Sequence, residues 1–242
     1  MPALEIKEGL PADTQLLARL VRERHSCRGF RPERVPRDTI EAMLVIAQGA
    51  ASWCNSQPWG VIVTEGEATE RFRAALYGHV ARSGWGEPGG RAEAPDFAFP
   101  ARYAGIYKER QRATGWALYE SVGIAHGDRQ GSARQMLENF NLFGAPHVMI
   151  VTTEADLGVY GAIDCGGYVT SFMLAAQALG VATIPQAALA FHSELVRRHF
   201  GLGDDRRVVC GISFGYPDHD HKANSYRTTR ASIADTATFV DE

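Results

Sequence analysis

A basic segment lies early in the chain, directly after the first predicted helix. Arg24, His25, Ser26 and Arg28 stand close together there. Guanidinium groups match phosphate oxygens with paired N–H donors, and a serine hydroxyl adds a further donor. The segment has the chemistry of a phosphate site, and a solvated basic turn is the competing interpretation.

A second polar stretch connects a helix end to a buried strand. Ser52, Asn55 and Gln57 occupy it, with Trp53 among them, and Pro58 stops further helix. Asparagine and glutamine each offer a donor and an acceptor, and tryptophan offers a ring face. The stretch suits a flat polar heterocycle, and an ordinary polar connection remains the alternative.

The second half of the chain adds two segments with possible binding chemistry. The turn Pro185-Gln186-Ala187 follows a short predicted strand and exposes backbone N–H groups, and the C-terminal tail carries Arg227 and Arg230. The run at 218–221 alternates Asp and His, but a solvated turn explains it better than a metal, so no metal is predicted.

The elements that must position these residues alternate along the chain, with long helices and few strands. Apolar periodicity predicts helices and strands at the following positions: helices at 13–23, 36–47, 67–77, 160–179 and from 193, a helical region broken near 123–128 at 101–143, and strands at 61–63, 147–152, 181–184 and 208–214. This favours an α+β fold over a doubly wound sheet. The segment 78–100 is rich in Gly and Pro, and is either an active-site cover or a surface insert.

Composition excludes several classes of protein. The chain has 242 residues, enough for one domain with a sizeable core, and a net charge of −3, which gives no general attraction to nucleic acid or anionic membranes. The start of the chain lacks a signal-peptide pattern, and no apolar run is long enough to span a membrane. Four dispersed cysteines suggest neither a zinc site nor a disulfide framework, so a cytoplasmic location is expected. Rossmann, P-loop and nucleophile-elbow motifs are missing from the sequence.

Four segments, in order, resemble the FMN-dependent nitroreductase family. They are Arg24–Phe30, Ala50–Trp59, Leu179–Ala187, and Gly211–Gly215 with the late Arg230. The resemblance extends from about residue 14 to 235. Each motif alone is weak, but the ordered set is specific for the family and not for its substrate.

The resemblance implies an α+β, three-layer nitroreductase-like fold, with a mixed, mainly antiparallel sheet flanked by helices. It implies a single domain over 1–242, in which 78–135 is a substrate-covering insertion. It also implies an intertwined homodimer whose tail, 216–242, is exchanged, with two FMN sites at the interface.

Roles for individual residues follow from the same resemblance. Arg24, His25, Ser26 and Arg28 would hold the FMN phosphate, ribityl chain and pyrimidine edge, and Arg227 and Arg230 would complete the phosphate site. Ser52, Asn55 and Gln57 would line the flavin, partly from the opposite subunit. Pro185, Gln186 and Ala187 would lie against the isoalloxazine with a backbone N–H facing N5. Many relatives have glycine at 187 or 188, which leaves the N5 donor open. The candidate substrate contacts are Trp53, Tyr103, Tyr107, Trp116 and Phe143.

The implied reaction transfers hydride from NADH or NADPH to FMN N5 and then to a nitroaromatic or quinone, in a ping-pong cycle. A nitro group would pass through nitroso to hydroxylamine. Flavin chemistry needs hydrogen-bond donors around the ring more than an acid–base dyad, so no catalytic side chain is assigned. Enone reduction, reductive dehalogenation, flavin fragmentation and non-catalytic flavin binding are the alternatives.

Overall fold

The centre of the molecule is a four-stranded sheet. The computed structural model describes residues 9–84 and 95–241. The strands are β1 (Gly60–Thr64), β2 (His147–Glu154), β3 (Ala182–Gln186) and β4 (Arg206–Gly215), in the spatial order β1-β2-β4-β3. All three strand pairs are antiparallel, and a bulge between Val151 and Thr152 interrupts the pairing of β2 with β4.

Strand β2 lies in the middle because both of its faces are apolar. Every residue of it except the last is buried, as expected for a strand covered on two sides. His147, at its start, accepts the Val35 N–H at its Nε2 over 3.0 Å, and its Nδ1 lies 3.1 Å from the Thr64 carbonyl. The imidazole thus joins three segments in the core.

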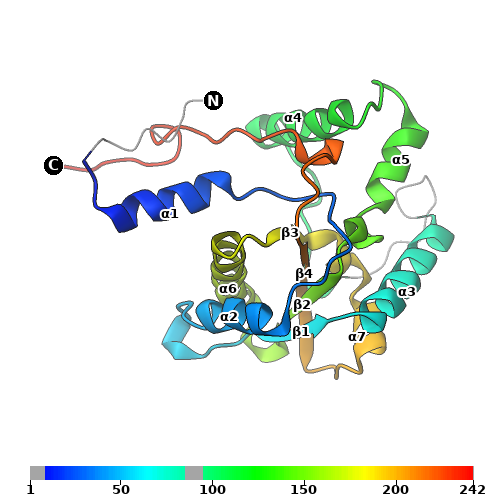
Figure 1. Ribbon diagram of the computed structural model, residues 1–242. Coiled ribbons are helices and arrows are strands. Elements are labelled where there is room, and N and C mark those ends of the chain that lie inside the picture. The colour runs from blue at the N-terminus through cyan, green and yellow to red at the C-terminus, as the bar shows by residue number, and fades with distance from the viewer. Residues whose placement is uncertain (1–8, 85–94, 242) are drawn as a thin grey trace.

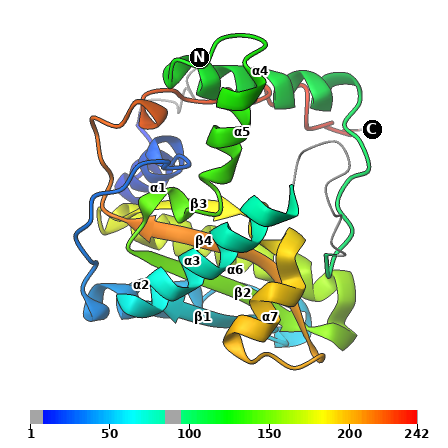
Figure 2. The same ribbon diagram turned by 90° about the vertical axis from the view of Figure 1, so that its right-hand side faces the viewer.

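Helices cover both faces of the sheet, which gives three layers (Figures 1 and 2). On one face α2 (Arg37–Ala47) and α6 (Gly158–Ala178) pack together, with Tyr168 and Phe172 of α6 in the core. On the other face α3 (Glu67–Ser83) and α7 (Ser193–Phe200) build a second core around Phe72 and Val196.

The remaining helices lie outside these layers. They are α1 (Ala12–Glu23), α4 (Gly105–Ser121) and α5 (Arg129–Leu137). Of these, α1 contacts α6. Neither α1 nor α4 buries a side chain. Short 3-10 turns connect the elements: η1 (Trp53–Asn55), η2 (Leu142–Gly144), η3 (Ala155–Leu157), η4 (Ala187–His192) and η5 (Lys222–Asn224).

The predicted α+β, three-layer architecture is confirmed, with two corrections. Residues 78–83, expected in the Gly- and Pro-rich connection, continue α3, because Val80 packs in the core and extends its buried face. The sheet is antiparallel at every strand pair, and the parallel element in the described chain is a single bridge between Ser26 and Thr183. The rest of the predicted cover falls partly on 85–94, outside the described residues.

Over residues 9–84 and 95–241, none of the helices combines the length and the apolar character needed to cross a bilayer.

Candidate functional site

The basic segment from the sequence analysis lies at one edge of the sheet. The Cys27 N–H donates to the Thr183 carbonyl of β3 over 3.0 Å, and the Arg31 N–H donates to the Tyr216 carbonyl over 2.9 Å. The Asp218 N–H returns a bond to the Gly29 carbonyl over 3.0 Å. Residues 27–31 are therefore held between β3 and the chain that leaves β4.

Cationic side chains from both ends of the chain meet at this edge. Burial, followed by the charge of Arg230, lowers the pKa of Arg24. Burial also lowers the pKa of His25, opposed by its hydrogen bond to the Glu23 carbonyl, and the charges of Arg227, Arg24 and Arg28 lower it further. Like charges that perturb one another in this way lie close in space.

These arginines have no carboxylate partners within the described ranges. Each of Arg24, Arg28, Arg227 and Arg230 lies outside the ion pairs found there. Several arginines elsewhere are paired, as Arg197 is with Asp96. A cluster of unneutralised cations that repel one another fits a dianionic phosphate, which would relieve the repulsion.

Aromatic rings hold Arg28 in place. Its guanidinium carbon lies 6.0 Å from the centre of the Phe143 ring and 5.7 Å from that of Tyr226. Phe143 and Leu142 both adopt positive φ, at 52° and 53°, which is strained for large side chains. Strained backbone of this kind persists only where the surrounding structure enforces it, and it is found most often at active and ligand-binding sites.

Pro185 and Gln186, predicted to lie in a turn, are the last two residues of β3 and pair with β4, because the strand extends further than expected; Ala187 begins η4. The Gln186 amide is buried, donates to the Asn139 carbonyl over 2.7 Å and accepts the Ser213 hydroxyl. Pro185 is half-buried and Ala187 is exposed. The side chain of Gln186 is thus engaged inside the protein and is not free to bind a cofactor.

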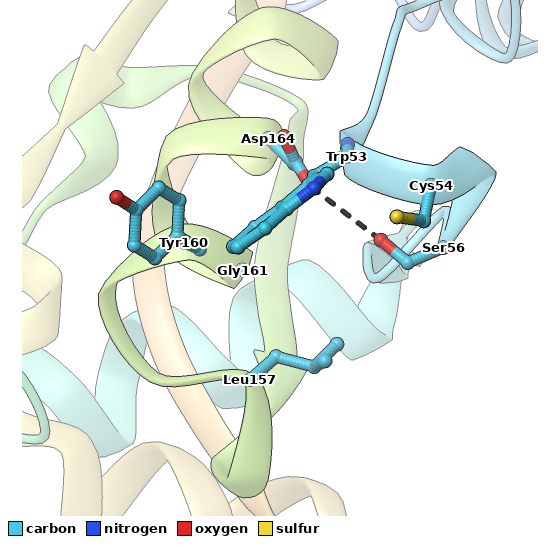
Figure 3. A pocket seen from close by; sticks show the side chains of 7 residues that line it. All are labelled: Trp53, Cys54, Ser56, Leu157, Tyr160, Gly161 and Asp164. Atoms are coloured by element: carbon cyan, nitrogen blue, oxygen red, sulfur yellow. Dashed lines mark hydrogen bonds between the residues drawn. The ribbon is translucent and has the colours of Figure 1, made fainter.

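The polar loop at 52–57 lies beside α6, at a distance from the arginine cluster. Asp164 of α6 accepts the main-chain N–H of Trp53 over 3.2 Å. It also accepts the Ser56 hydroxyl over 3.5 Å (Figure 3). Asp164 lies in the second turn of α6 and holds this loop.

The loop itself is strained and exposed. The φ angles of Cys54, Asn55 and Gln57 are 52°, 56° and 47°. The Ser52 hydroxyl accepts the Gln57 N–H over 3.0 Å, which closes the loop on itself. The Asn55 and Gln57 side chains face solvent within one chain. A pocket of about 220 Å³ lies between the loop and α6 (Figure 3).

The five predicted substrate residues lie on three parts of the chain: η1, α4 with the residues just before it, and η2. The Trp53 ring lies tilted at 57° to the Tyr160 ring, with 4.7 Å between the ring centres. Phe143 lies in η2 beside Arg28. The other three, Tyr103, Tyr107 and Trp116, are exposed on α4 or just before it. A single chain therefore does not gather them into one wall.

Sequence reasoning missed a cleft and a residue near Arg28. The cleft, of about 650 Å³, is lined mainly by the ends of α4 and α5 and by 218–222, with Phe143 and Arg28. The residue is Asn224, which is buried and contacts Arg28 and Gly29. Its contacts span 196 and 195 positions, so no local pattern in the sequence could reveal them.

In the Asp–His run at 218–221, side chains accept hydrogen bonds from nearby main-chain N–H groups. Asp218 accepts the Asp220 N–H over 3.0 Å, and the His221 ring accepts the Ala223 N–H over 3.3 Å. Across the described ranges, no group of three or more potential ligands is arranged to hold a metal ion.

The fold and this site can be compared with known proteins. Residues 21–216 match the model of the nitroreductase family. The chain belongs to the nitroreductase family.

Its relatives include proteins named as reductases. It is 34% identical to nitroreductase NfnB of Mycolicibacterium smegmatis, over 93% of each chain. It is also 34% identical to a 4-nitrobenzoate reductase of Pseudomonas putida, over 87% of this chain and 89% of that protein. The crystal structure of the FMN-dependent nitroreductase NfnB from Mycobacterium smegmatis in complex with NADPH superposes with a TM-score of 0.86, covering 94% of this chain and 99% of that one.

Proposed function

We propose that this protein is an FMN-dependent oxidoreductase that uses NADH or NADPH to reduce a nitroaromatic compound or a quinone. The observation that carries the proposal is the cluster of Arg24, Arg28, Arg227 and Arg230. These cations come from both ends of the chain and have no carboxylate partners in the described ranges. Similar proteins are FMN-dependent, and others are named for nitrobenzoate and nitrobenzene.

The residues present fit FMN. Arg24, Arg227 and Arg230 would bind its phosphate, and the Ser26 hydroxyl would add a donor. Burial and its arginine neighbours lower the pKa of His25, which favours the neutral ring, and a neutral ring can hydrogen-bond without adding repulsion. Arg28, which lies near two aromatic rings, would add a further cation to the phosphate site.

FMN supplies two-electron hydride chemistry when it is bound. The protein then has to bind, orient and shield rather than transfer protons itself. Pro185, Gln186 and Ala187 would support the ring and present a backbone N–H toward it. The reaction would alternate between the nicotinamide donor and the acceptor in one pocket, which is a ping-pong scheme. Each cycle would transfer two electrons, so two equivalents of NADH or NADPH would reduce a nitro group through nitroso to hydroxylamine.

We also propose a homodimer with exchanged tails, which the surface of one chain supports. The Ser52, Asn55 and Gln57 loop is exposed and distant from the arginine cluster, so a second copy would bring it to the flavin. Val159 and Ile163 expose apolar side chains on α6 nearby. Beyond Arg230 the tail leaves the body (Figure 1), and Phe239 and Val240 are 84% and 85% exposed. A second copy would cover these apolar groups.

The insertion at 78–135 would cover the substrate in that dimer. Tyr103, Tyr107 and Trp116 are then candidate substrate contacts, together with Trp53 and Phe143 from other elements. All four cysteines are free thiols, which supports a cytoplasmic location.

The direct test is to purify the protein, measure its bound flavin and follow NADH or NADPH oxidation with 4-nitrobenzoate, a quinone and an enone. We expect stoichiometric FMN and turnover with the nitro compound or the quinone. A protein that stays colourless after reconstitution with FMN refutes the proposal. Bound FMN that neither nicotinamide reduces under anaerobic conditions would indicate a non-catalytic flavin protein, and preference for the enone would indicate a different reaction.

A further inference from the structure

The two cationic arms of the proposed phosphate site lie on segments far apart in the chain. The first arm is 24–28 and the second is 227–230. Their arginines lower the pKa values of Arg24 and His25, so before a phosphate arrives the arms repel each other. Something must hold them together in the free protein, because a site that has to be assembled during binding loses affinity.

Asn224 is bonded to both arms. Its side-chain oxygen accepts the Arg28 N–H over 2.7 Å, and its side-chain nitrogen donates to the Gly29 carbonyl over 2.9 Å. Its main-chain carbonyl accepts the guanidinium of Arg227 over 2.7 Å. A single buried residue therefore contacts Arg28 of one arm and Arg227 of the other.

The geometry leaves Asn224 little freedom. The second hydrogen of its amide goes to the Asp218 carbonyl over 2.8 Å, so both donors and the oxygen are engaged. Gly29 and His221 also pack closely, since a Cβ atom built on Gly29 would lie 2.2 Å from Cγ of His221. Tyr226, two positions after Asn224, places its ring against the Arg28 guanidinium.

We infer that Asn224 is a positioning residue that holds the two cationic arms in register for the phosphate of the cofactor. The inference rests on the proposed FMN site. It assigns Asn224 no contact with FMN. Its effect should therefore depend on the phosphate and leave recognition of the flavin ring unchanged.

The test compares FMN with riboflavin, which has the same ring system and no phosphate. Flavin fluorescence titrations would use apo-protein of the wild type, Asn224→Ala and Asn224→Asp. We expect Asn224→Ala to weaken FMN binding at least about tenfold and riboflavin binding less than about twofold. Asn224→Asp keeps an acceptor for the Arg28 N–H, but it places a carboxylate against the Gly29 and Asp218 carbonyl oxygens and near the bound phosphate. It should therefore lose at least as much FMN affinity as Asn224→Ala.

Ser225→Ala is the matched control. It lies on the same turn, is exposed, and loses one local bond from its hydroxyl to the Lys222 carbonyl. It should bind both flavins as the wild type does. The inference would be overturned if both Asn224 variants kept the wild-type ratio of FMN to riboflavin affinity, whether neither flavin lost affinity or both lost it equally.

A measurement on the unmodified protein covers the case in which the variants do not fold. In apo wild type, the Arg28 amide should be protected from hydrogen exchange, because Asn224 holds it before FMN binds. Free exchange of that amide contradicts the inference. A wild type that binds no FMN refutes the proposed function itself, whereas normal FMN binding with an unprotected Arg28 amide refutes only the role of Asn224.

Discussion

Replacing Arg24 and Arg230 together tests whether the two ends of the chain share one phosphate. Each side chain would give a charge-assisted hydrogen bond of about 1.5–3 kcal/mol to that group. Losing both costs about 3–6 kcal/mol, which weakens FMN binding by roughly two to four orders of magnitude. Riboflavin binding should change little, because it has no phosphate.

The same double variant should not destabilise the apo-protein. Neither arginine has a carboxylate partner in the described chain, and the charge of Arg230 lowers the pKa of Arg24. Removing two cations that repel each other therefore leaves the unfolding free energy unchanged or slightly higher. Loss of cofactor without loss of stability distinguishes a binding role from a structural one.

The assay is titration of apo-protein with FMN and with riboflavin, followed by urea unfolding of the apo forms. Arg71→Ala with Arg198→Ala is the matched control, since it removes the same charge from exposed i,i+4 pairs on α3 and α7. FMN affinity within about threefold of wild type in the Arg24→Ala, Arg230→Ala protein would show that the phosphate assignment is wrong.

Three further outcomes are expected. Deleting 232–242, which leaves the Asn224 contacts intact, should give a folded chain that is monomeric or aggregates in light scattering; a stable flavin-loaded dimer would contradict the exchanged tail. Asp96→Asn should lower the unfolding free energy by about 3–5 kcal/mol in urea titrations, because it breaks a buried pair with Arg197; a loss under about 1 kcal/mol would show that the pair is dispensable. Burial lowers the pKa of His147, so its contribution to stability is present above about pH 6.5 and is lost as the pH falls through the folded-state pKa. Melting temperatures of wild type should therefore drop more steeply in acid than those of His147→Gln, and parallel curves would refute this.

Local patterns were enough to predict the type of most elements. Apolar periodicity placed α2, α6 and β2 within a few residues of their observed ends. It could do so because the spacing of apolar residues along the chain reflects which faces of a helix or strand are buried. It failed at 78–83, where glycine and charged residues suggested a loop. There the burial of Val80 against the second core outweighs the local preference.

The sequence also predicted which residue types form the candidate site. Arginine clusters near both ends, the amide-rich loop and the segment 185–187 are all patterns of neighbouring residues, and together they pointed to a phosphate and a flat polar ring. Their resemblance to one family agrees with the match over 21–216.

Tertiary structure alone decided how these groups meet. The approach of Arg24 to Arg230, the capture of the Arg28 amide by Asn224 and the internal use of the Gln186 side chain join segments that are tens to hundreds of positions apart. Such contacts depend on how strands pair and layers pack, which no short window of sequence encodes. The sequence alone determined which chemical groups the protein carries, and the fold determined which of them face one another and which are already engaged.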